Sequence, residues 1–86
     1  MLERDLQVTD PLGLHAQASA KVVQALTGFR SQCFLHARGR EVNAKSIMGV
    51  MLLAAGPGTS LRARIDGPDE AEAMAALVAL FESSFR

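Results

Sequence analysis

The sequence predicts a single α+β domain over residues 1–86, with a four-stranded antiparallel sheet covered by helices on one face. Three observations lead to this prediction. Segments with alternating apolar residues and segments of helical period follow one another in the order β-α-β-β-α-β-α. A short turn at 38–40 joins two strands, which must therefore be antiparallel. Each strand has one apolar side, so the uncovered face of the sheet should meet water.

Four segments have the alternating pattern of half-buried strands. The pattern is clearest where Leu61, Ala63 and Ile65 share one face while Arg62 and Arg64 share the other. We therefore expect the first set to face the core and the second to face solvent. The expected strands are 2–9, 31–37, 41–44 and 60–66.

Three segments have the 3.6-residue period of helices. The last follows Gly67-Pro68-Asp69-Glu70, where Pro68 suits the first helical position and the acidic residues suit the positive end of a helix. The expected helices are 16–27, 47–53 and the segment from Pro68 onward. The expected core-facing stripes are Ser19, Val22, Val23 and Leu26 in the first helix, and Ala71, Met74, Leu77, Val78, Phe81 and Phe85 in the last.

Composition limits the function classes. Nine basic and nine acidic residues cancel, so no basic excess is present to hold a nucleic acid or an anionic membrane. The single cysteine, Cys33, excludes an intramolecular disulfide and fits a reducing compartment. No apolar run resembles a signal peptide or spans a bilayer. We expect a cytoplasmic monomer that binds neither nucleic acid nor membrane.

The chemical centre of the sequence is His15, in the stretch 13–18 where a strand pattern gives way to a helical one. We interpret His15 as the residue that caps the helix, which leaves the N–H groups of Ala16, Gln17 and Ala18 unpaired and pointing toward the ring. A helix start favours a bound anion, and a neutral imidazole is a good nucleophile. The pattern favours a histidine that accepts and passes on a phosphoryl group. The alternative is a polar loop histidine without chemistry.

The short helix over 47–53 is unusually apolar. One or two helical turns cannot bury all of its side chains, so we expect some to remain exposed as a docking surface for partner proteins. Ile47, Met48 and Met51 are the candidate partner-binding residues, and flexible methionines suit several partners. The alternative is that this helix is simply part of the core. Ser46 is placed to cap it.

No other pattern indicates a catalytic, metal or cofactor site. His36 alternates with Phe34 on the expected wet face, and Cys33 is expected to fill the core as a small apolar residue. His15, Cys33 and His36 lack the spacing of metal ligands. The glycines of 54–59 lack the residues of a nucleotide-binding loop. We therefore expect no metal and no cofactor.

Two motifs give the chain a family resemblance. Gly13-Leu14-His15-Ala16 matches the active-site sequence GLHARPA of the histidine-containing phosphocarrier (HPr) family of the bacterial phosphotransferase system, and 43–51 matches that family's signature around a serine. Length and element order match as well. The resemblance implies an open-faced two-layer sandwich with strand order 1-4-2-3.

The resemblance also implies a function. His15 would be phosphorylated on Nδ1 by enzyme I, which takes its phosphoryl group from phosphoenolpyruvate, and would donate it to an enzyme IIA. Ile47, Met48 and Met51 would border His15 and dock these partners. In some family members a dedicated serine kinase acts on the residue matching Ser46, and a phosphorylase reverses it, so Ser46 is a candidate regulatory site. The chain would be a carrier rather than an independent catalyst.

Two departures from the family motif bear on this function. Gln17 stands where the family has arginine, and Ala18 where it has proline. A charged hydrogen bond is worth about 1 kcal/mol more than the neutral one that Gln17 can offer, so the change would slow transfer by up to roughly tenfold. Lys21 or Lys45 is available to compensate. Gln17 also supports a second interpretation, an HPr-like regulatory binding module with weak or no phosphotransfer. The sequence leaves open whether the chain serves sugar uptake or, as its C-terminal segment suggests by resemblance, nitrogen-related regulation.

Overall fold

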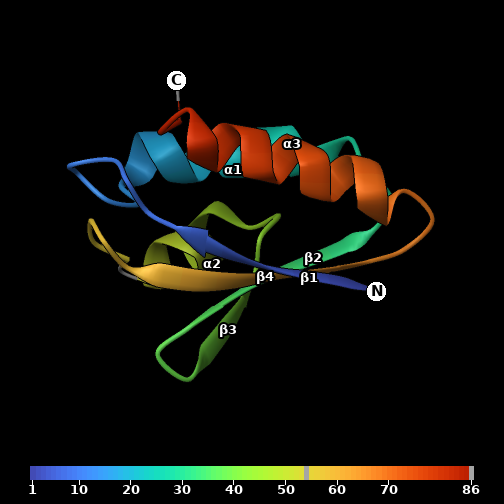
Figure 1. Cartoon of the computed structure of the whole chain (residues 1–86), viewed down its shortest axis with the longest axis horizontal. Helices are drawn as coiled ribbons and strands as arrows, with labels where there is room; N and C mark the ends of the chain where they lie inside the picture. Colours follow the sequence, from blue (N-terminus) through green and yellow to red (C-terminus); the bar gives the residue numbers. More distant parts are fainter. Residues whose placement is uncertain (54, 86) are drawn as a thin grey trace.

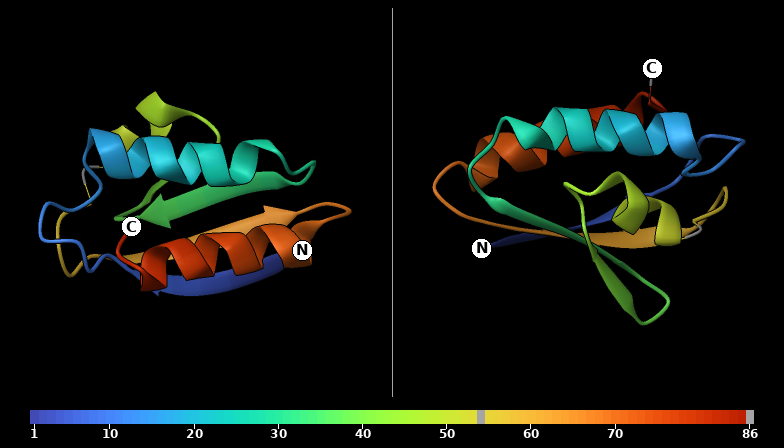
Figure 2. Two further views of the ribbon diagram at one scale, coloured as in Figure 1. Left: turned by 90° about the horizontal axis from the view of Figure 1, so that it is seen from above. Right: turned by 180° about the vertical axis from the view of Figure 1, so that it is seen from behind.

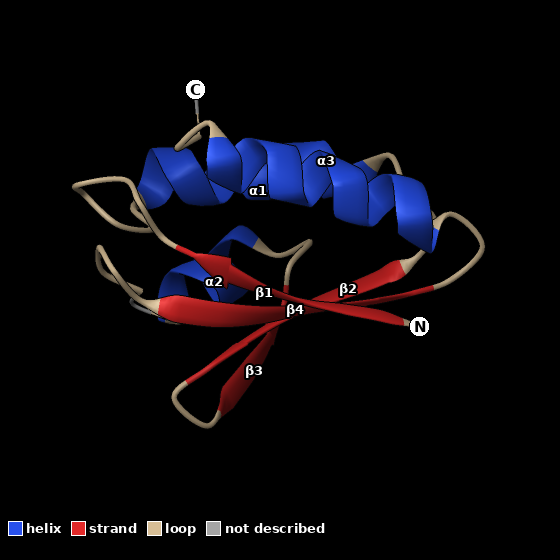
Figure 3. Ribbon diagram, viewed as in Figure 1, coloured by secondary structure: helices blue, strands red, loops and turns tan. Residues whose placement is uncertain are grey.

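The structure, a computed structural model, describes residues 1–53 and 55–85. Helices α1 and α3 lie side by side across one face of a twisted sheet, and the opposite face is open (Figures 1 and 3). The short α2 packs on the outer side of α1 (Figure 2, left). The elements in chain order are β1 (Leu2–Gln7), α1 (Ala16–Thr27), β2 (Gln32–Ala37), β3 (Arg40–Asn43), α2 (Ile47–Leu52), β4 (Ser60–Asp66) and α3 (Glu70–Glu82).

The sheet has the order β1-β4-β2-β3, and all neighbouring strands are antiparallel. This confirms the expected order 1-4-2-3 and the open-faced sandwich. The β2–β3 hairpin turns at Arg38 and Gly39, whose φ angles are 54° and 77°. Positive φ at both central residues is the geometry that matches the twist of a two-residue hairpin, so this turn fixes the pairing of Ala37 with Arg40.

The core fills the space between the sheet and the helices. Sheet residues such as Leu35 and Ile65 and helix residues such as Leu26 and Leu77 are completely buried. The open face is polar, and there Arg64 donates to Glu41 at 2.9 Å. Because one side of each strand is buried and the other faces solvent, apolar and polar side chains alternate along the strands. The fully buried large side chains are Leu26, Leu35, Leu61, Ile65, Leu77, Val8, Val22 and Val50.

Several strand and helix ends differ from the expected ones by one or two residues. β1 ends at Gln7 instead of Thr9, because the backbone of Val8 turns to bond Gly58 and Thr59 in the facing loop. β2 starts after Ser31, whose N–H and hydroxyl donate to the carboxylate of Asp69. β3 is shifted one residue earlier, to Arg40–Asn43, and α2 ends at Leu52.

The expected start and stripe of α3 need correction. Pro68 lies outside the helix, since Asp69 is the N-cap with φ −118° and ψ 31° and Glu70 is the first helical residue. Ala71 is exposed, whereas Ala73 is buried. At 100° per residue, Ala71 lies about 120° around the helix from Leu77, at the rim of the buried face. The Asp69 carboxylate does not cap its own helix and instead accepts from Arg30 and Ser31.

Candidate functional site

His15 caps α1, as its position in the sequence predicts. Its backbone is extended, with φ −74° and ψ −178°, and its carbonyl accepts the first helical bond from Ser19 at 2.8 Å. The ring Nδ1 accepts from the backbone N–H of Gln17 at 3.2 Å. The side chain is 28% exposed, so a partner protein can reach the ring.

The loop before His15 is held by close backbone contacts. Gly13 has φ +69°, and a Cβ at this position would lie 2.5 Å from the carbonyl oxygen of Ala55. The next residue, Leu14, donates its N–H to the same carbonyl at 2.8 Å and is buried. A side chain at residue 13 would therefore be both strained and obstructed. This glycine allows the loop to pack tightly and fixes the direction in which His15 enters the helix.

The hydrogen bonds of His15 determine where the ring carries its proton. A backbone N–H can only donate, so Nδ1 must present its lone pair to Gln17. The neutral ring then carries its proton on Nε2, which lies 3.8 Å from Oδ2 of Asp10. Asp10 is itself held in place, because its Oδ1 accepts from Leu12 N at 2.8 Å. Nδ1 is thus the nitrogen available as a nucleophile.

The helix N–H groups differ in one respect from the expected arrangement. Ala16, Gln17 and Ala18 were all expected to leave their N–H groups unpaired, but that of Gln17 is bonded to the His15 ring. The N–H groups of Ala16 and Ala18 have no hydrogen-bond partner within residues 1–53 and 55–85. Ala16 and Gln17 are exposed, while the methyl group of Ala18 is buried. The positive end of α1 is therefore open beside the ring.

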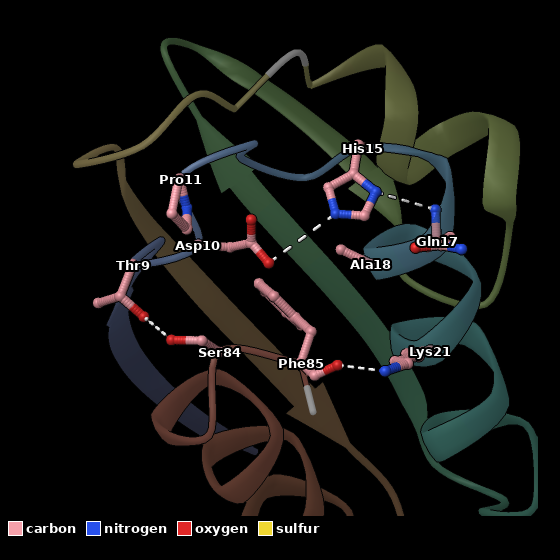
Figure 4. A pocket seen from close by; sticks show the side chains of 9 residues that line it. All are labelled: Thr9, Asp10, Pro11, His15, Gln17, Ala18, Lys21, Ser84 and Phe85. Carbon is pink, nitrogen blue, oxygen red and sulfur yellow. Dashed lines mark hydrogen bonds and ion pairs between the residues drawn. The ribbon is translucent and has the colours of Figure 1, made fainter.

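A cavity of about 430 Å³ lies next to His15, and three separate segments line it (Figure 4). These segments are the loop before α1, the first turns of α1 and the turn after α3. The first and third are joined by a hydrogen bond of 2.7 Å between the hydroxyls of Thr9 and Ser84. Ser84 and Phe85 both have positive φ, at 54° and 65°, and the Phe85 ring packs edge-on against Phe81. The lining residues are Thr9, Asp10, Pro11, His15, Gln17, Ala18, Lys21, Ser84 and Phe85.

The structure separates the two lysines that the sequence left as alternatives. Lys21 lines the His15 cavity, and its Nζ donates to the backbone carbonyl of Phe85. Lys45 instead donates to the carbonyl of Phe29 at 2.6 Å, just beyond the C-terminal end of α1. His15 lies at the N-terminal end of that helix. Lys21, not Lys45, is therefore the lysine that lines the cavity beside His15.

The apolar helix α2 is exposed, as its sequence predicts. Of its six residues only Val50 is buried, and Met48 is 75% exposed. α2 lies below the half of α1 that begins with His15 (Figure 2, right). The patch of exposed side chains consists of Ile47, Met48, Met51 and Leu52. Leu52, which is 59% exposed, extends the expected patch of Ile47, Met48 and Met51.

Ser46 is exposed at the start of α2, and its hydroxyl accepts from the N–H of Gly49 at 3.1 Å. The serine therefore acts as a helix cap.

On the open face of the sheet, His36 is exposed, away from the helices. Burial raises the pKa of the Cys33 thiol, which is 1% exposed and packs in the core. Cys33 is consequently a protonated core residue rather than a reactive thiol.

No group of three or more His, Cys, Asp or Glu side chains in residues 1–53 and 55–85 is arranged to hold a metal ion. Over the same ranges, no helix has the length and apolar character needed to cross a bilayer.

The comparison with protein families decides the classification. The family model described as "PTS HPr component phosphorylation site" matches residues 2–83. The chain belongs to the HPr family. It is 62% identical over 85 residues to the phosphocarrier protein HPr of Xylella fastidiosa (strain Temecula1), an alignment that covers 99% of this chain and 96% of that protein. Membership makes it a phosphocarrier-family protein of the phosphotransferase system.

More distant members of the HPr family agree in length and fold. The crystal structure of HPr-C-His from Thermoanaerobacter tengcongensis superimposes with a TM-score of 0.95 at 41% identity, and covers 99% of this chain and 96% of that one. The phosphocarrier protein NPr of Escherichia coli K12 is 32% identical over 85 residues, which is 98% of this chain and 94% of that protein. The resemblance inferred from the two sequence motifs is thus confirmed.

Proposed function

We propose that this chain, acting as one domain over residues 1–86, accepts a phosphoryl group on Nδ1 of His15 from enzyme I and passes it to an enzyme IIA. The observation that carries the proposal is the bond from Gln17 N–H to Nδ1, which presents a lone pair at the open end of α1. The ring is partly exposed and stands beside a cavity of about 430 Å³. These features describe a nucleophile with space for a phosphoryl group.

The transfer step can be written from these contacts. Nδ1 of His15 attacks phosphorus, the Nδ1–P bond forms, and the bond from phosphorus to the donor breaks with its electron pair leaving on the donor. The proton on Nε2 stays in place, facing the Asp10 carboxylate 3.8 Å away. The reverse step delivers the group to the acceptor. In this step the group moves only between the donor, Nδ1 and the acceptor, so the chain acts as a carrier of the phosphoryl group.

The backbone N–H groups of Ala16, Gln17 and Ala18 are the proposed phosphate ligands. Those of Ala16 and Ala18 are available in the described structure, and that of Gln17 becomes available when phosphorus replaces it at Nδ1. Such donors favour an anion because their dipoles are already oriented and need no rearrangement during transfer.

The exposed patch on α2 is the proposed docking surface for both partners. Met48 is its most exposed member, at 75%. The helix that carries it, α2, lies below the N-terminal half of α1 (Figure 2, right). Replacing Met48 by Asp should weaken enzyme I binding about tenfold or more, since a charge would be buried against an apolar surface. Stability should be unchanged. Calorimetric titration with enzyme I measures this, and Ala75→Asp on the exposed side of α3 is the matched control.

Ser46 is the proposed regulatory site of a serine kinase and phosphorylase. Its hydroxyl is exposed and directly precedes Ile47, the first residue of the patch. A phosphate there would add nearly two negative charges beside the docking surface and would weaken an acidic partner's binding. The capping bond to Gly49 explains the serine without any kinase, so incubation with such a kinase followed by intact mass is the test of regulation.

Two finer assignments complete the proposal. The sequence is closer to the HPr of Xylella fastidiosa than to the NPr of Escherichia coli, at 62% against 32% identity, and this favours sugar uptake over nitrogen-related regulation. We expect the chain to act in the cytoplasm as a monomer. Size-exclusion chromatography with light scattering tests the monomer.

The experiment that tests the carrier function is incubation with phosphoenolpyruvate and enzyme I, followed by intact mass. The chain should gain one phosphate that is lost in mild acid, and His15→Ala should gain none. Absence of the gain with several enzyme I preparations would reject the carrier and favour the binding module. Gln17→Arg would then show whether the missing arginine is the cause.

A further inference from the structure

A phosphoryl group on His15 would enter a cavity with little positive charge. The group carries between about one and a half and two negative charges near neutral pH. The cavity already contains the carboxylate of Asp10, and Gln17 offers only a neutral amide. The end of α1 supplies about half a unit of positive charge. A bound phosphoryl group therefore calls for a further cation from the cavity wall.

Lys21 is the only lysine or arginine among the described residues that line this cavity. It follows Gln17 by four positions, so the two side chains lie on the same face of α1. Side chains on a helix lean toward its N-terminus, which directs Lys21 toward the turn that begins with His15. The lysine is thus placed by the helix itself.

The head of Lys21 is held at the cavity by the end of α3. Its Nζ donates to the Phe85 carbonyl, and both residues line the cavity (Figure 4). The turn that presents this carbonyl is tied to the loop before α1 through the hydroxyls of Thr9 and Ser84. An ammonium has three N–H donors, so it can keep the bond to Phe85 and still offer two to a phosphoryl oxygen.

We propose that Lys21 is the cationic ligand of the phosphoryl group carried on Nδ1 of His15, oriented for this role by the Phe85 carbonyl. The inference deepens the proposed function, because it assigns a ligand to the same phosphoryl group. Lys21 forms and breaks no covalent bond. It compensates for the neutral Gln17 with a charge that comes from one helical turn further along α1.

The test loads the histidine chemically with phosphoramidate, so that it does not depend on enzyme I. The chain's two histidines are His15 and His36, and a His36→Gln background leaves His15 as the only one to be loaded. Phosphorus NMR across pH then measures the midpoint at which the bound phosphoryl group takes up its last proton. A nearby ammonium stabilises the dianion and lowers this midpoint.

Lys21→Met should raise the midpoint by about half a unit or more, and Lys21→Arg should largely restore it. Lys45→Met is the matched control, since Lys45 also binds a backbone carbonyl but lies at the other end of α1, and it should leave the midpoint unchanged. Circular dichroism verifies the fold, and Lys21→Gln serves if the methionine variant unfolds.

Equal midpoints in the unchanged chain and in Lys21→Met would overturn the inference, as would failure of phosphoramidate to load His15. Loading by phosphoramidate without any loading by enzyme I would reject the proposed carrier function alone, and the midpoints would still decide the role of Lys21.

Discussion

At the scale of single residues, the chemistry of the site depends on which nitrogen of one ring is free. The sequence predicts His15 as the cap of α1 and as the nucleophile, because a helix start after a strand pattern is a local signal. The sequence could not predict Asp10 as the partner of Nε2, since Asp10-Pro11 is also an ordinary turn signal. Only the folded loop brings this carboxylate within 3.8 Å of the ring.

Asp10→Asn should slow phosphoryl transfer to His15 about two- to fivefold, because a partly exposed contact of this length contributes about 0.5–1 kcal/mol. The amide oxygen can still accept from Leu12, so the loop should keep its shape. Nitrogen NMR of the ring should show a smaller share of the form protonated on Nε2. Asp5→Asn, an exposed carboxylate on the open sheet face, is the control. An unchanged ring and an unchanged rate would exclude a positioning role for Asp10.

At the scale of elements, sequence predicts the helices best where their stripes and caps are local. α1 runs over Ala16–Thr27 as expected, and Ser46 caps α2 as expected. The start of α3 differs because its N-cap, Asp69, is bonded to Arg30 and Ser31, nearly forty positions earlier in the chain. A tertiary contact of this kind leaves no periodic pattern, so the favourable position of Pro68 was misleading.

The bonds of Asp69 predict how stability responds to acid. The hydroxyl of Ser31 and the backbone N–H groups of Arg30 and Ser31 hold the pKa of this carboxyl below its usual value. A lowered pKa in the folded state stabilises the fold above the unfolded-state pKa of about 3.9, and the contribution is lost as pH falls through the lower folded-state pKa. The free energy of unfolding should therefore decrease in this acidic range.

The check is urea unfolding at a series of pH values, for the unchanged chain and for Asp69→Asn. At neutral pH the unchanged chain should have a larger free energy of unfolding than Asp69→Asn. The difference between the two free energies should shrink as the pH is lowered below about 4. Asp5→Asn controls for the loss of one negative charge. A difference that stays constant with pH would show that Asp69 does not link β2 to α3 through its charge.

At the scale of the whole molecule, the fold was largely predictable and the site only in part. Alternation, the tight hairpin and the helical periods were enough to predict an antiparallel sheet covered on one face. The resemblance carried by two motifs indicated the family and the strand order. The cavity was not predictable, because it joins the loop before α1, the first turns of α1 and the turn after α3. Sequence left Lys21 and Lys45 as equal alternatives, and the packing of α3 against α1 distinguishes them.

The arrangement of these three segments leads to one central claim, that the chain carries a phosphoryl group on Nδ1 of His15. The most direct measurement is proton–nitrogen NMR of the ¹⁵N-labelled chain after phosphorylation with phosphoenolpyruvate and enzyme I. The account predicts coupling of phosphorus to Nδ1 of His15, with the proton retained on Nε2. Phosphorus on Nε2, on another residue, or on none would contradict it.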